Sequence, residues 1–278
     1  MKIRAGQTIL LTGASGGLGV FMTRAFFNSG VNLGLVAYPG TGLEELRQEA
    51  EQHRTRAMAM ASDLRLPAQR RLVLERLRQE FGEVDVLINN AGVEVTAPYH
   101  ELPEESVEDA IRVNLEAAMV LTKLVLPGML KRGSGHIVNI SSLAGKAGPA
   151  YQEPYAATKA ALIAFTSSLR ATYRNTGVSA SVIVPGFVEA GIYAKLKDRA
   201  GCAAPALLGT SPPSKVVRAL FRAIESDLPE VIVNPIPVRP LLAFTALFPR
   251  LGEWMSNRTG ANEFFKSVVD AEKSSAPK

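Results

Sequence analysis

Hydrophobic residues in this chain follow two spacings, and the two alternate along the sequence. Short apolar runs rich in β-branched residues have the character of buried strands, while the segments between them carry apolar residues every three or four positions, as helices do. The pattern predicts seven strands, at residues 8–11, 31–37, 56–61, 84–88, 135–140, 178–184 and 230–233. It predicts helices at residues 17–28, 42–53, 67–81, 105–131, 155–175 and 213–226. Strands that alternate with helices favour an α/β fold, with a doubly wound, mostly parallel sheet covered on both faces.

The residues from 238 onward break this alternation. Pro240 and Pro249 bound an apolar run rich in Leu and Phe, which precedes Trp254. The run is too short to span a bilayer, which takes about 20 apolar residues in a helix. We therefore expect residues 1–237 to form one α/β domain and residues 238–278 to form an apolar, helical extension packed on its core. The run could instead cover a lipophilic pocket, lie on a membrane surface or pack between subunits.

The charge and cysteine content argue against several other classes of protein. The formal net charge is +5, but the basic residues are spread along the chain without a basic tail, so we expect no nucleic-acid partner. Residues 65–78 are rich in arginine and also carry Glu75, and we interpret them as the solvated face of a helix. The single cysteine, Cys202, cannot form an intrachain disulfide, which favours a reducing, cytoplasmic location. The three histidines show no metal-ligand spacing, and no stretch is typical of a membrane-spanning helix.

A glycine-rich turn follows the first predicted strand. The residues from Thr12 onward carry Gly13, Gly16, Gly17 and Gly19 and lead directly into a predicted helix. Glycines permit a tight turn and let a phosphate approach the backbone, and the amino end of the helix offers free N–H groups and a favourable dipole. A strand, a glycine-rich turn and a helix in this order indicate a dinucleotide-binding site.

Small or polar residues also mark the ends of later elements. The second strand ends at Ala37, with neither the acid that binds ribose hydroxyls nor the base that binds a 2′-phosphate. Asp63, after the third strand, could hydrogen-bond an adenine amino group or cap the next helix. Asn114 lies inside a predicted helix, where Asn is unfavourable, so we expect it either to bond the backbone locally or to hold a water molecule.

Tyr155 and Lys159 form the most informative pair in the sequence. Residues four apart lie on one face of a helix, so the ammonium group can sit beside the phenol oxygen. A free phenol has a pKa of about 10, and a neighbouring positive charge lowers that pKa. A tyrosine tuned in this way can exchange a proton with a carbonyl or carbinol oxygen.

In their order and spacing these features resemble the short-chain dehydrogenase/reductase family, from about residue 6 to residue 234. The resemblance implies a Rossmann-like doubly wound sheet and makes residues 1–237 a dinucleotide-binding and catalytic domain. It implies an NAD(P)-dependent oxidoreductase that transfers a hydride between the cofactor and a carbonyl or alcohol, here on a hydrophobic small molecule. The matching motifs are Thr12-Gly13-x-x-x-Gly17-x-Gly19, Asn89-Asn90-Ala91-Gly92, Asn114, Ser142, Tyr155-x-x-x-Lys159 and Pro185-Gly186.

The resemblance also implies a role for each matching residue. Tyr155 is the expected general acid/base, and Ser142 the expected partner of the substrate oxygen, with Ser141 as a competing and more structural choice. Lys159 would lower the pKa of Tyr155 and hold the nicotinamide ribose, while Asn114 would keep a water molecule in a proton relay. The expected cofactor-binding residues are Gly13, Ser15, Gly16, Gly17, Leu18, Gly19, Tyr38, Asp63, Leu64, Asn90, Ala91, Gly92, Tyr155, Lys159, Pro185, Gly186 and Val188. The expected substrate-binding residues are Glu94, Ser142, Tyr151, Phe187, Ile192 and Tyr193.

Two positions depart from the family pattern. Gly16 occupies a place where NADP-preferring members often carry a basic residue, but the second strand also lacks the acid of NAD-preferring members, and on balance this favours NADP(H) over NAD(H). Ala190 stands where the family often has a threonine that bonds the nicotinamide carboxamide.

Residues 191–206 have the mixed, small-residue pattern of a mobile lid. Glu94 could meet a polar substrate group, the alternative being a carboxylate on a surface loop.

Other functions remain open on the sequence alone. The chain could reduce a C=N or C=C bond, or it could be a non-catalytic cofactor sensor that keeps the fold. The complete set of Asn114, Ser142, Tyr155 and Lys159 argues against the sensor, because a non-catalytic protein need not keep all four. Members of such families are usually homodimers or homotetramers, which we expect here, and peripheral membrane contact through the extension stays open.

Overall fold

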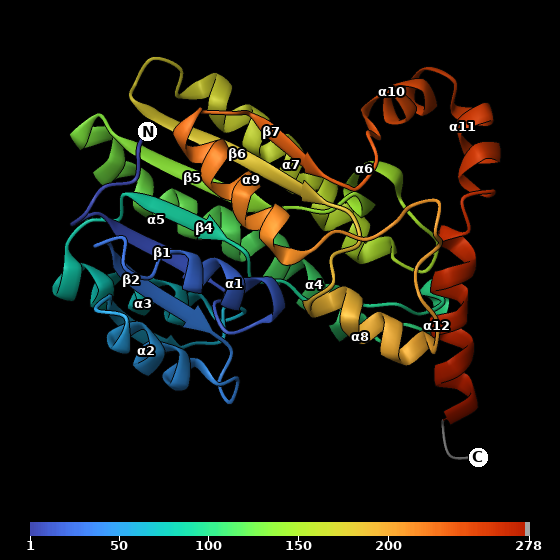
Figure 1. The fold of residues 1–278 in the computed structure, drawn as a ribbon, viewed down its shortest axis with the longest axis horizontal. Coiled ribbons are helices and arrows are strands. Elements are labelled where there is room, and N and C mark those ends of the chain that lie inside the picture. The colour runs from blue at the N-terminus through green and yellow to red at the C-terminus, as the bar shows by residue number, and fades with distance from the viewer. Residues whose placement is uncertain (276–278) are drawn as a thin grey trace.

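Seven parallel strands form one sheet at the centre of the molecule, in the order β3-β2-β1-β4-β5-β6-β7 (Figure 1). The structure is a computed structural model that describes residues 1–275. The strands are β1 (Thr8–Thr12), β2 (Asn32–Ala37), β3 (Arg56–Ala61), β4 (Val86–Asn89), β5 (Gly135–Ile140), β6 (Val178–Pro185) and β7 (Glu230–Val233). Each strand predicted from the apolar runs is present, so the predicted doubly wound parallel sheet is confirmed.

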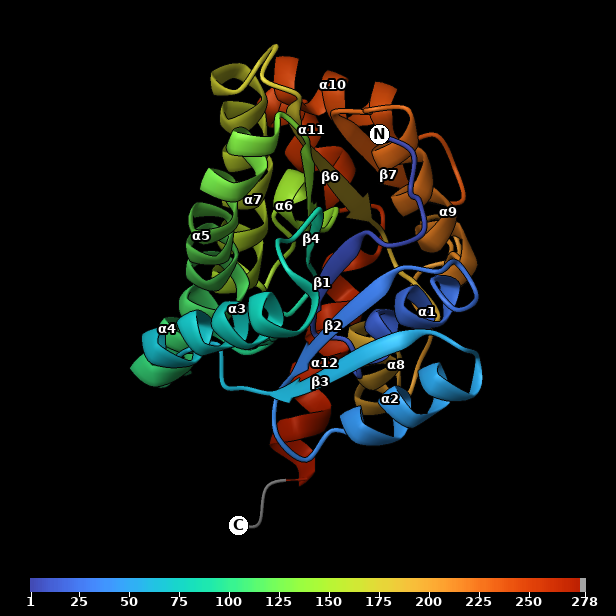
Figure 2. The same ribbon diagram turned by 90° about the vertical axis from the view of Figure 1, so that its left-hand side faces the viewer.

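Helices cover both faces of this sheet, which Figure 2 shows edge-on as three layers. One face carries α1 (Gly17–Ala25), α2 (Leu43–Gln52) and α9 (Pro213–Glu225). The other carries α3 (Pro67–Phe81), α5 (Ala117–Arg132) and α7 (Glu153–Thr172). Each layer buries its own apolar cluster, since strand side chains point alternately to the two faces. Short elements complete this part of the chain: η1 (Tyr99–Glu101), α4 (Glu104–Ile111), α6 (Ala144–Ala147) and the π-helical turn η2 (Arg112–Glu116).

The helical segment Glu104–Arg132 consists of α4, η2 and α5, and by length and composition alone it is long and apolar enough to cross a membrane. This differs from the expectation that no stretch would do so: its most apolar window has a mean hydropathy of 1.4. Leu121, Val125 and Met129 of this segment are buried against the sheet. The buried side of the segment thus owes its apolar character to packing in the protein core, as core helices commonly do.

Arg70 corrects the interpretation of the arginine-rich segment as a solvated face. Its side chain is fully buried, and its guanidinium donates to the backbone carbonyls of Leu64 and Arg65. It also forms an ion pair of 2.7 Å with Glu116 in η2. A buried arginine needs such partners to offset its desolvation, and here they tie the turn after β3 to the helix that carries Asn114.

The expected lid contains an ordered helix, α8 (Gly191–Ala200), which packs against the last helix, α12 (Ala261–Ser275). Tyr193 and Leu196 of α8 form a buried cluster with Phe264, Phe265 and Val268 of α12. Both helices lie at the carboxyl ends of the strands (Figure 1). The lid is therefore held from outside by the end of the chain, which the sequence pattern did not indicate.

The rest of the extension forms two short helices, α10 (Arg239–Leu247) and α11 (Pro249–Ser256), here called the C-terminal hairpin. Figure 1 shows the C-terminal hairpin standing off the sheet and its covering helices. The two helices pack on each other, and a Cβ added at Gly252 would lie 2.8 Å from the Cβ of Thr245. The extension is helical, as expected; where the domain ends and the extension begins stays a prediction.

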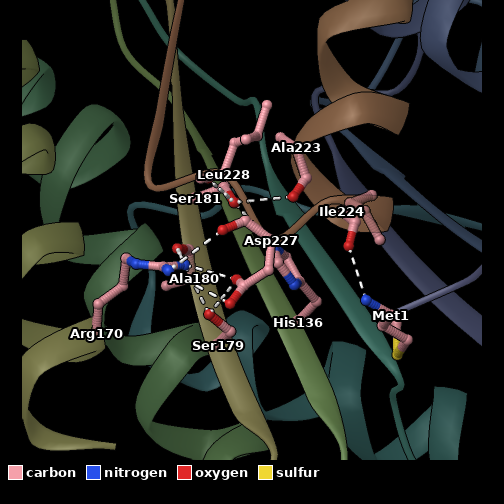
Figure 3. Close-up of polar contacts among 10 residues, drawn as sticks. All are labelled: Met1, His136, Arg170, Ser179, Ala180, Ser181, Ala223, Ile224, Asp227 and Leu228. Atoms are coloured by element: carbon pink, nitrogen blue, oxygen red, sulfur yellow. Dashed lines mark hydrogen bonds and ion pairs between the residues drawn. The ribbon is translucent and has the colours of Figure 1, made fainter. Parts of the chain in front are cut away.

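A polar network lies at the opposite edge of the sheet, where β5 and β6 begin (Figure 3). Arg170 of α7 donates to the carboxylate of Asp227 at 2.7 Å and to the carbonyl of Ala180 at 2.8 Å. His136 shares a hydrogen bond of 2.9 Å with Ser181, whose hydroxyl donates to the carbonyl of Leu228. The network joins α7, β5, β6 and the loop before β7 away from the carboxyl ends of the strands.

We predict that His136 makes the fold sensitive to acid. Burial lowers the pKa of His136 to about 4, and Asp227 offsets part of that effect. An unfolded histidine titrates near pH 6.5, so between pH 6.5 and 4 the unfolded chain binds more protons than the folded one. The stabilisation is complete above pH 6.5, and about 3 kcal/mol of it should be lost as the pH falls through this window.

The measurement is urea unfolding of wild type, His136→Asn and, as a control, His100→Asn, whose side chain is largely exposed. Because it removes the titrating group, His136→Asn should flatten the dependence of the unfolding free energy on pH between 6.5 and 4, whatever its effect at pH 7. An equally steep decline in His136→Asn and in the control would show that other groups cause the acid sensitivity.

Candidate active site

A cavity of about 1060 Å³ opens at the carboxyl ends of the strands. Its wall is built by the β1–α1 turn, the ends of β4, β5 and β6, the start of α7, α8 and the C-terminal hairpin. The expected site residues that line it are Gly13, Gly16, Gly17, Leu18, Asn90, Ala91, Gly92, Ser142, Tyr155, Lys159, Pro185, Gly186, Phe187, Val188, Ile192 and Tyr193. The expected residues outside its lining are Ser15, Gly19, Tyr38, Asp63, Leu64, Glu94, Asn114 and Tyr151.

The glycine-rich turn presents a bare helix end to this cavity. Gly13 adopts a φ of +65°, which favours glycine, and α1 begins after Gly16 without a side-chain cap and without an acidic residue in its first turn. The first N–H groups of a helix have no partner within the helix, so this end can bind an anion. Asn90 fixes the turn by donating to the carbonyls of Thr12 and Gly13. These features fit the diphosphate of a dinucleotide.

The lid lies directly on this turn. A Cβ added at Gly17 would lie 2.1 Å from the Cα of Gly191, the first residue of α8. Gly191 has a φ of +57°, and a Cβ there would in turn lie 3.1 Å from the Cα of Gly17. Two helix ends can approach so closely only because both residues lack a side chain.

Tyr155 lies in the cavity wall near the start of α7 and is 8% exposed. Burial raises the pKa of its phenol to about 12, an effect that the Ser142 hydroxyl partly offsets and the charge of Glu94 strengthens. Tyr155 is thus a neutral phenol at pH 7 in this structure, and it can donate a proton.

Lys159 does not lower the pKa of Tyr155 in this structure, contrary to the expectation from their spacing. Its ammonium donates to the carbonyl of Ile140 at 3.0 Å and lies 5.5 Å from the centre of the Tyr155 ring, over the ring's face. Burial lowers the pKa of Lys159 to about 8, so the group is still mostly protonated at neutral pH. The strand carbonyl, which is distant in sequence, competes with the phenol oxygen for the ammonium.

The side chain of Asn114 bonds the backbone of a distant loop and not the backbone of its own helix, and its role in holding a water molecule stays a prediction. Its side chain accepts from the N–H of Val93 at 2.7 Å and donates to the carbonyl of Val93 at 2.9 Å. It also donates to the hydroxyl of Thr158 at 3.1 Å, beside Lys159. A Cβ at Gly92 would lie 3.3 Å from the Asn114 oxygen and 3.4 Å from the Lys159 ammonium, so the three residues meet at one point. The π turn that carries Asn114 is a feature often found at functional sites.

The two serines after β5 differ in their surroundings. The Ser141 hydroxyl donates to the carbonyl of Lys159 at 2.7 Å, which fits the structural role expected for it. The Ser142 hydroxyl accepts from the N–H of Ala144 at 3.2 Å and faces the cavity near Tyr155. Ser142 can therefore still donate its proton to a ligand.

At the end of β2 the structure brings in a basic residue that sequence reasoning missed. The guanidinium of Arg65 lies over the ring of Tyr38, 5.7 Å from its centre. Asp63 and Asp109 hold it there, at 2.7 and 2.6 Å, and the hydrogen bond from Arg65 lowers the pKa of Asp63. Asp63 therefore does not cap α3, whose first turn has no side-chain cap.

The hydroxyls of Ser15 and Thr41 meet at 2.7 Å between the glycine turn and the loop after β2.

The alternative that Glu94 is a carboxylate on a surface loop is wrong, because its side chain is only 8% exposed. It forms an ion pair of 3.1 Å with Arg199 of α8 and accepts from the amide of Gln152. Arg199 also pairs with Glu272 of α12. Tyr151 packs against the aromatic cluster of α8 and α12, and its contact with substrate stays a prediction. Both residues support the lid from behind.

Among residues 1–275, no group of three or more His, Cys, Asp or Glu side chains is placed to hold a metal ion.

Comparisons with known proteins agree with this geometry. The family model described as short chain dehydrogenase matches residues 7–201. Ketoacyl reductase HetN of Nostoc sp. is 38% identical over 239 residues, 86% of this chain and 82% of that protein. 3-Oxoacyl-[acyl-carrier-protein] reductase FabG of Escherichia coli is 34% identical over 224 residues, 80% of this chain and 91% of its own length. The crystal structure of a variant of actinorhodin polyketide ketoreductase with NADPH has a TM-score of 0.76 and 26% identity, covering 83% of this chain and 97% of that chain.

We predict that Gly17→Ala, but not Gly16→Ala, separates the lid from the glycine turn. The methyl group added at Gly17 would collide with the backbone of Gly191. A methyl group added at Gly16 would meet only the carbonyl oxygen of Gly13, at 3.5 Å, an ordinary contact distance. Fluorescence titration with NADPH should show at least about a tenfold weaker Kd for Gly17→Ala, roughly 1.4 kcal/mol. Gly16→Ala, the matched control, should stay within about twofold of wild type, a difference of under 0.5 kcal/mol. Equal affinities in the two variants would contradict the predicted contact with α8.

Proposed function

The chain belongs to the short chain dehydrogenase family and is an NAD(P)-dependent oxidoreductase of the ketoreductase type, and from this premise we propose that it reduces a ketone on a hydrophobic acyl chain with NADPH. The observation that carries the proposal is the shared position of Tyr155 and Ser142 in a cavity whose far wall is apolar. Proteins that this chain resembles are named for 3-oxoacyl or ketoacyl reduction, and these names support a ketoacyl group as the proposed substrate.

The size and lining of the cavity support a hydrophobic substrate. The cavity of about 1060 Å³ must hold substrate together with cofactor, because the glycine turn and Tyr155 line the same space, and its size is at the upper end of the range for small-molecule sites. Beyond Ser142 and Tyr155 the wall includes apolar side chains from the loops after β5 and β6, from α8 and the loop after it, and from α10: Leu143, Phe187, Ile192, Leu196, Leu207, Leu241 and Leu242. An acyl chain bound against them would be removed from water, which stabilises the complex by about 0.8 kcal/mol for each buried methylene.

The proton chemistry of the proposed reaction belongs to Tyr155. When bound, the reduced nicotinamide supplies the hydride that joins the carbonyl carbon. Tyr155 donates its phenolic proton to the carbonyl oxygen, so the C=O bond becomes an alcohol and the phenol becomes a phenolate. The Ser142 hydroxyl donates a hydrogen bond to the same oxygen and holds it in place. Because the pKa of Tyr155 is raised, the proton is present on the phenol at neutral pH.

Lys159 is proposed to serve the cofactor first and the phenolate second. The groups proposed to hold the cofactor are the amino end of α1 for the diphosphate and the Lys159 ammonium for the nicotinamide ribose. To stabilise the phenolate left by proton transfer, the ammonium has to turn from the carbonyl of Ile140 toward the phenol oxygen when the cofactor binds. Asn114 positions the loop at Gly92 and Val93 against this lysine.

A preference for NADPH is proposed from the end of β2. No carboxylate follows Ala37 to repel a 2′-phosphate, and Arg65 reaches Tyr38 from the turn after β3. Arg65 thus occupies a region where a basic group can bind a phosphate, although it comes from a different loop than the family pattern suggests.

We also propose that the protein is a homo-oligomer. Apolar side chains are exposed to solvent at the end of α4 and along α5: Ile111, Met119 and Leu130. Contact between copies would cover them. A cytoplasmic location stays a prediction.

Tyr155→Phe should abolish reduction and spare cofactor binding. Loss of a general acid lowers rates by about 10² to 10⁴-fold, and the ring that remains still fills its site. Absorbance of NADPH with a short 3-ketoacyl thioester measures the rate, and fluorescence titration measures the Kd for NADPH. Tyr151→Phe is the matched control, because it removes the same atom from a nearby tyrosine outside the cavity lining. A rate in Tyr155→Phe equal to that of the control would overturn the mechanism.

Arg65→Gln should weaken NADPH binding more than NADH binding, by about five- to tenfold in the ratio of the two Kd values, as expected for the loss of a charge-assisted hydrogen bond. Arg71→Gln, on the exposed face of α3, is the control of equal charge change. Ala37→Asp should shift the ratio in the same direction by adding a carboxylate at the ribose. If neither variant changes the ratio relative to Arg71→Gln, the 2′-phosphate lies elsewhere.

A further inference from the structure

The turn of the C-terminal hairpin exposes a continuous apolar tip, made of Leu247, Phe248, Pro249, Leu251 and Trp254. Leu247 is 74% exposed and Trp254 is 52% exposed. Single exposed apolar residues such as Leu66 and Tyr99 also occur elsewhere on the surface and need no explanation. Figure 1 shows that the hairpin projects from the rest of the fold, and several exposed apolar residues together on such an element mark a surface that something covers.

The other side of the same hairpin forms part of the cavity wall. Leu241, Leu242 and Thr245 of α10 line the cavity, as do Gly252 and Met255 of α11. Trp254 belongs to both surfaces, because it lines the cavity and is also half exposed. The apolar tip is therefore continuous with the wall of the proposed substrate site.

The charges around the tip are mostly positive. Residues 238–260 contain Arg239, Arg250 and Arg258 and one acid, Glu253, which gives a net charge of +2. Arg250 lies within the tip itself, and the guanidinium of Arg258 stacks on the ring of Trp254 at 4.0 Å from its centre. An apolar tip that carries one arginine and has others beside it complements a surface that is apolar inside and anionic outside.

A second copy of the chain fits this tip less well than a lipid surface does. Stable protein interfaces use about 20–30 residues on each side, and the tip has five. Two short helices carrying Leu, Phe and Trp with basic flanks have the composition of elements that lie about 5–10 Å deep in the headgroup region. Tryptophan in particular favours that region, because its ring is apolar and its N–H is polar.

We propose that the tip of the C-terminal hairpin is a docking surface for an anionic lipid bilayer. Leu247, Phe248 and Leu251 enter the headgroup boundary, and Arg250 and Arg258 meet lipid phosphates. Docking there turns the hairpin side of the cavity toward the bilayer, so a substrate with a long acyl chain passes from lipid to Tyr155 with little exposure to water. The docking itself does not depend on the proposed reaction.

Trp254 provides a local reporter, because it is the only tryptophan in the sequence. The full-length protein is mixed with vesicles of phosphatidylcholine that contain about 30% phosphatidylglycerol, and with vesicles of phosphatidylcholine alone. Anionic vesicles should shift the Trp254 emission to shorter wavelength and carry the protein to the vesicle fraction on flotation, and added salt should weaken this binding. An unchanged emission spectrum with the anionic vesicles would overturn the proposal.

The variant Leu247→Asp/Phe248→Asp tests the apolar tip, since neither residue lines the cavity. It should reduce the bound fraction on anionic vesicles at least about tenfold, because each change removes an exposed apolar group and adds a charge that anionic lipid repels. The control is Leu66→Asp/Tyr99→Asp, which places the same charges at exposed apolar positions outside the hairpin and should bind as wild type does. Arg250→Glu should bind less than the exposed-surface control Arg71→Glu.

Two further measurements separate this proposal from its competitors. Reduction of a short, water-soluble 3-ketoacyl thioester should be the same in Leu247→Asp/Phe248→Asp as in wild type, so loss of docking is distinguishable from failure of the proposed reaction. Light scattering after gel filtration gives the mass of each variant. A lower mass for the tip variant, with vesicle binding equal to that of the control, would show that the tip contacts a second copy and would overturn the lipid docking.

Discussion

Parallel pairing of all seven strands is the constraint on which the rest of this structure depends. Each parallel pair needs a crossover, so every strand ends at the same edge of the sheet and every loop that follows a strand starts there. The order of strands reverses between β1 and β4, and the chain leaves these two strands toward opposite faces. The glycine turn after β1 and the loop at Gly92 after β4 open on either side of that point. The cavity follows from this topology before any side chain is considered.

The sequence predicts well what depends on local spacing. The alternation of apolar runs and helical segments is enough to find all seven strands, and the four-residue separation of Tyr155 and Lys159 places both in the cavity wall. It predicts less well what depends on partners far along the chain. Lys159 turns toward the carbonyl of Ile140 in β5, and that contact could not be read from the helix alone.

The arginines and Glu94 show the same limit with respect to charge. Arg70 and the exposed Arg71 are neighbours in one helix, and the burial of Arg70 depends on its partners, which include Glu116, 46 residues away. Arg65 becomes a candidate for cofactor binding only when the turn after β3 meets Tyr38. Glu94 is buried because Arg199 reaches it from α8. The composition of a segment indicates the average environment of its charged residues. Tertiary contacts determine whether each of these side chains is buried or exposed.

The clamp of α12 on α8 has a consequence for the order in which the protein is made. A ribosome releases the glycine turn and strands β1 to β6 first, then α8 and β7, and all of these emerge before the residues of α12. Until then Tyr193 and Leu196 lack the phenylalanines that bury them, and Arg199 lacks Glu272. The nascent chain can thus complete its nucleotide-binding sheet while the wall of the cavity is still open. The pocket can therefore close only after α12 has been made, and a chain that stops short of residue 261 lacks the helix that holds the lid.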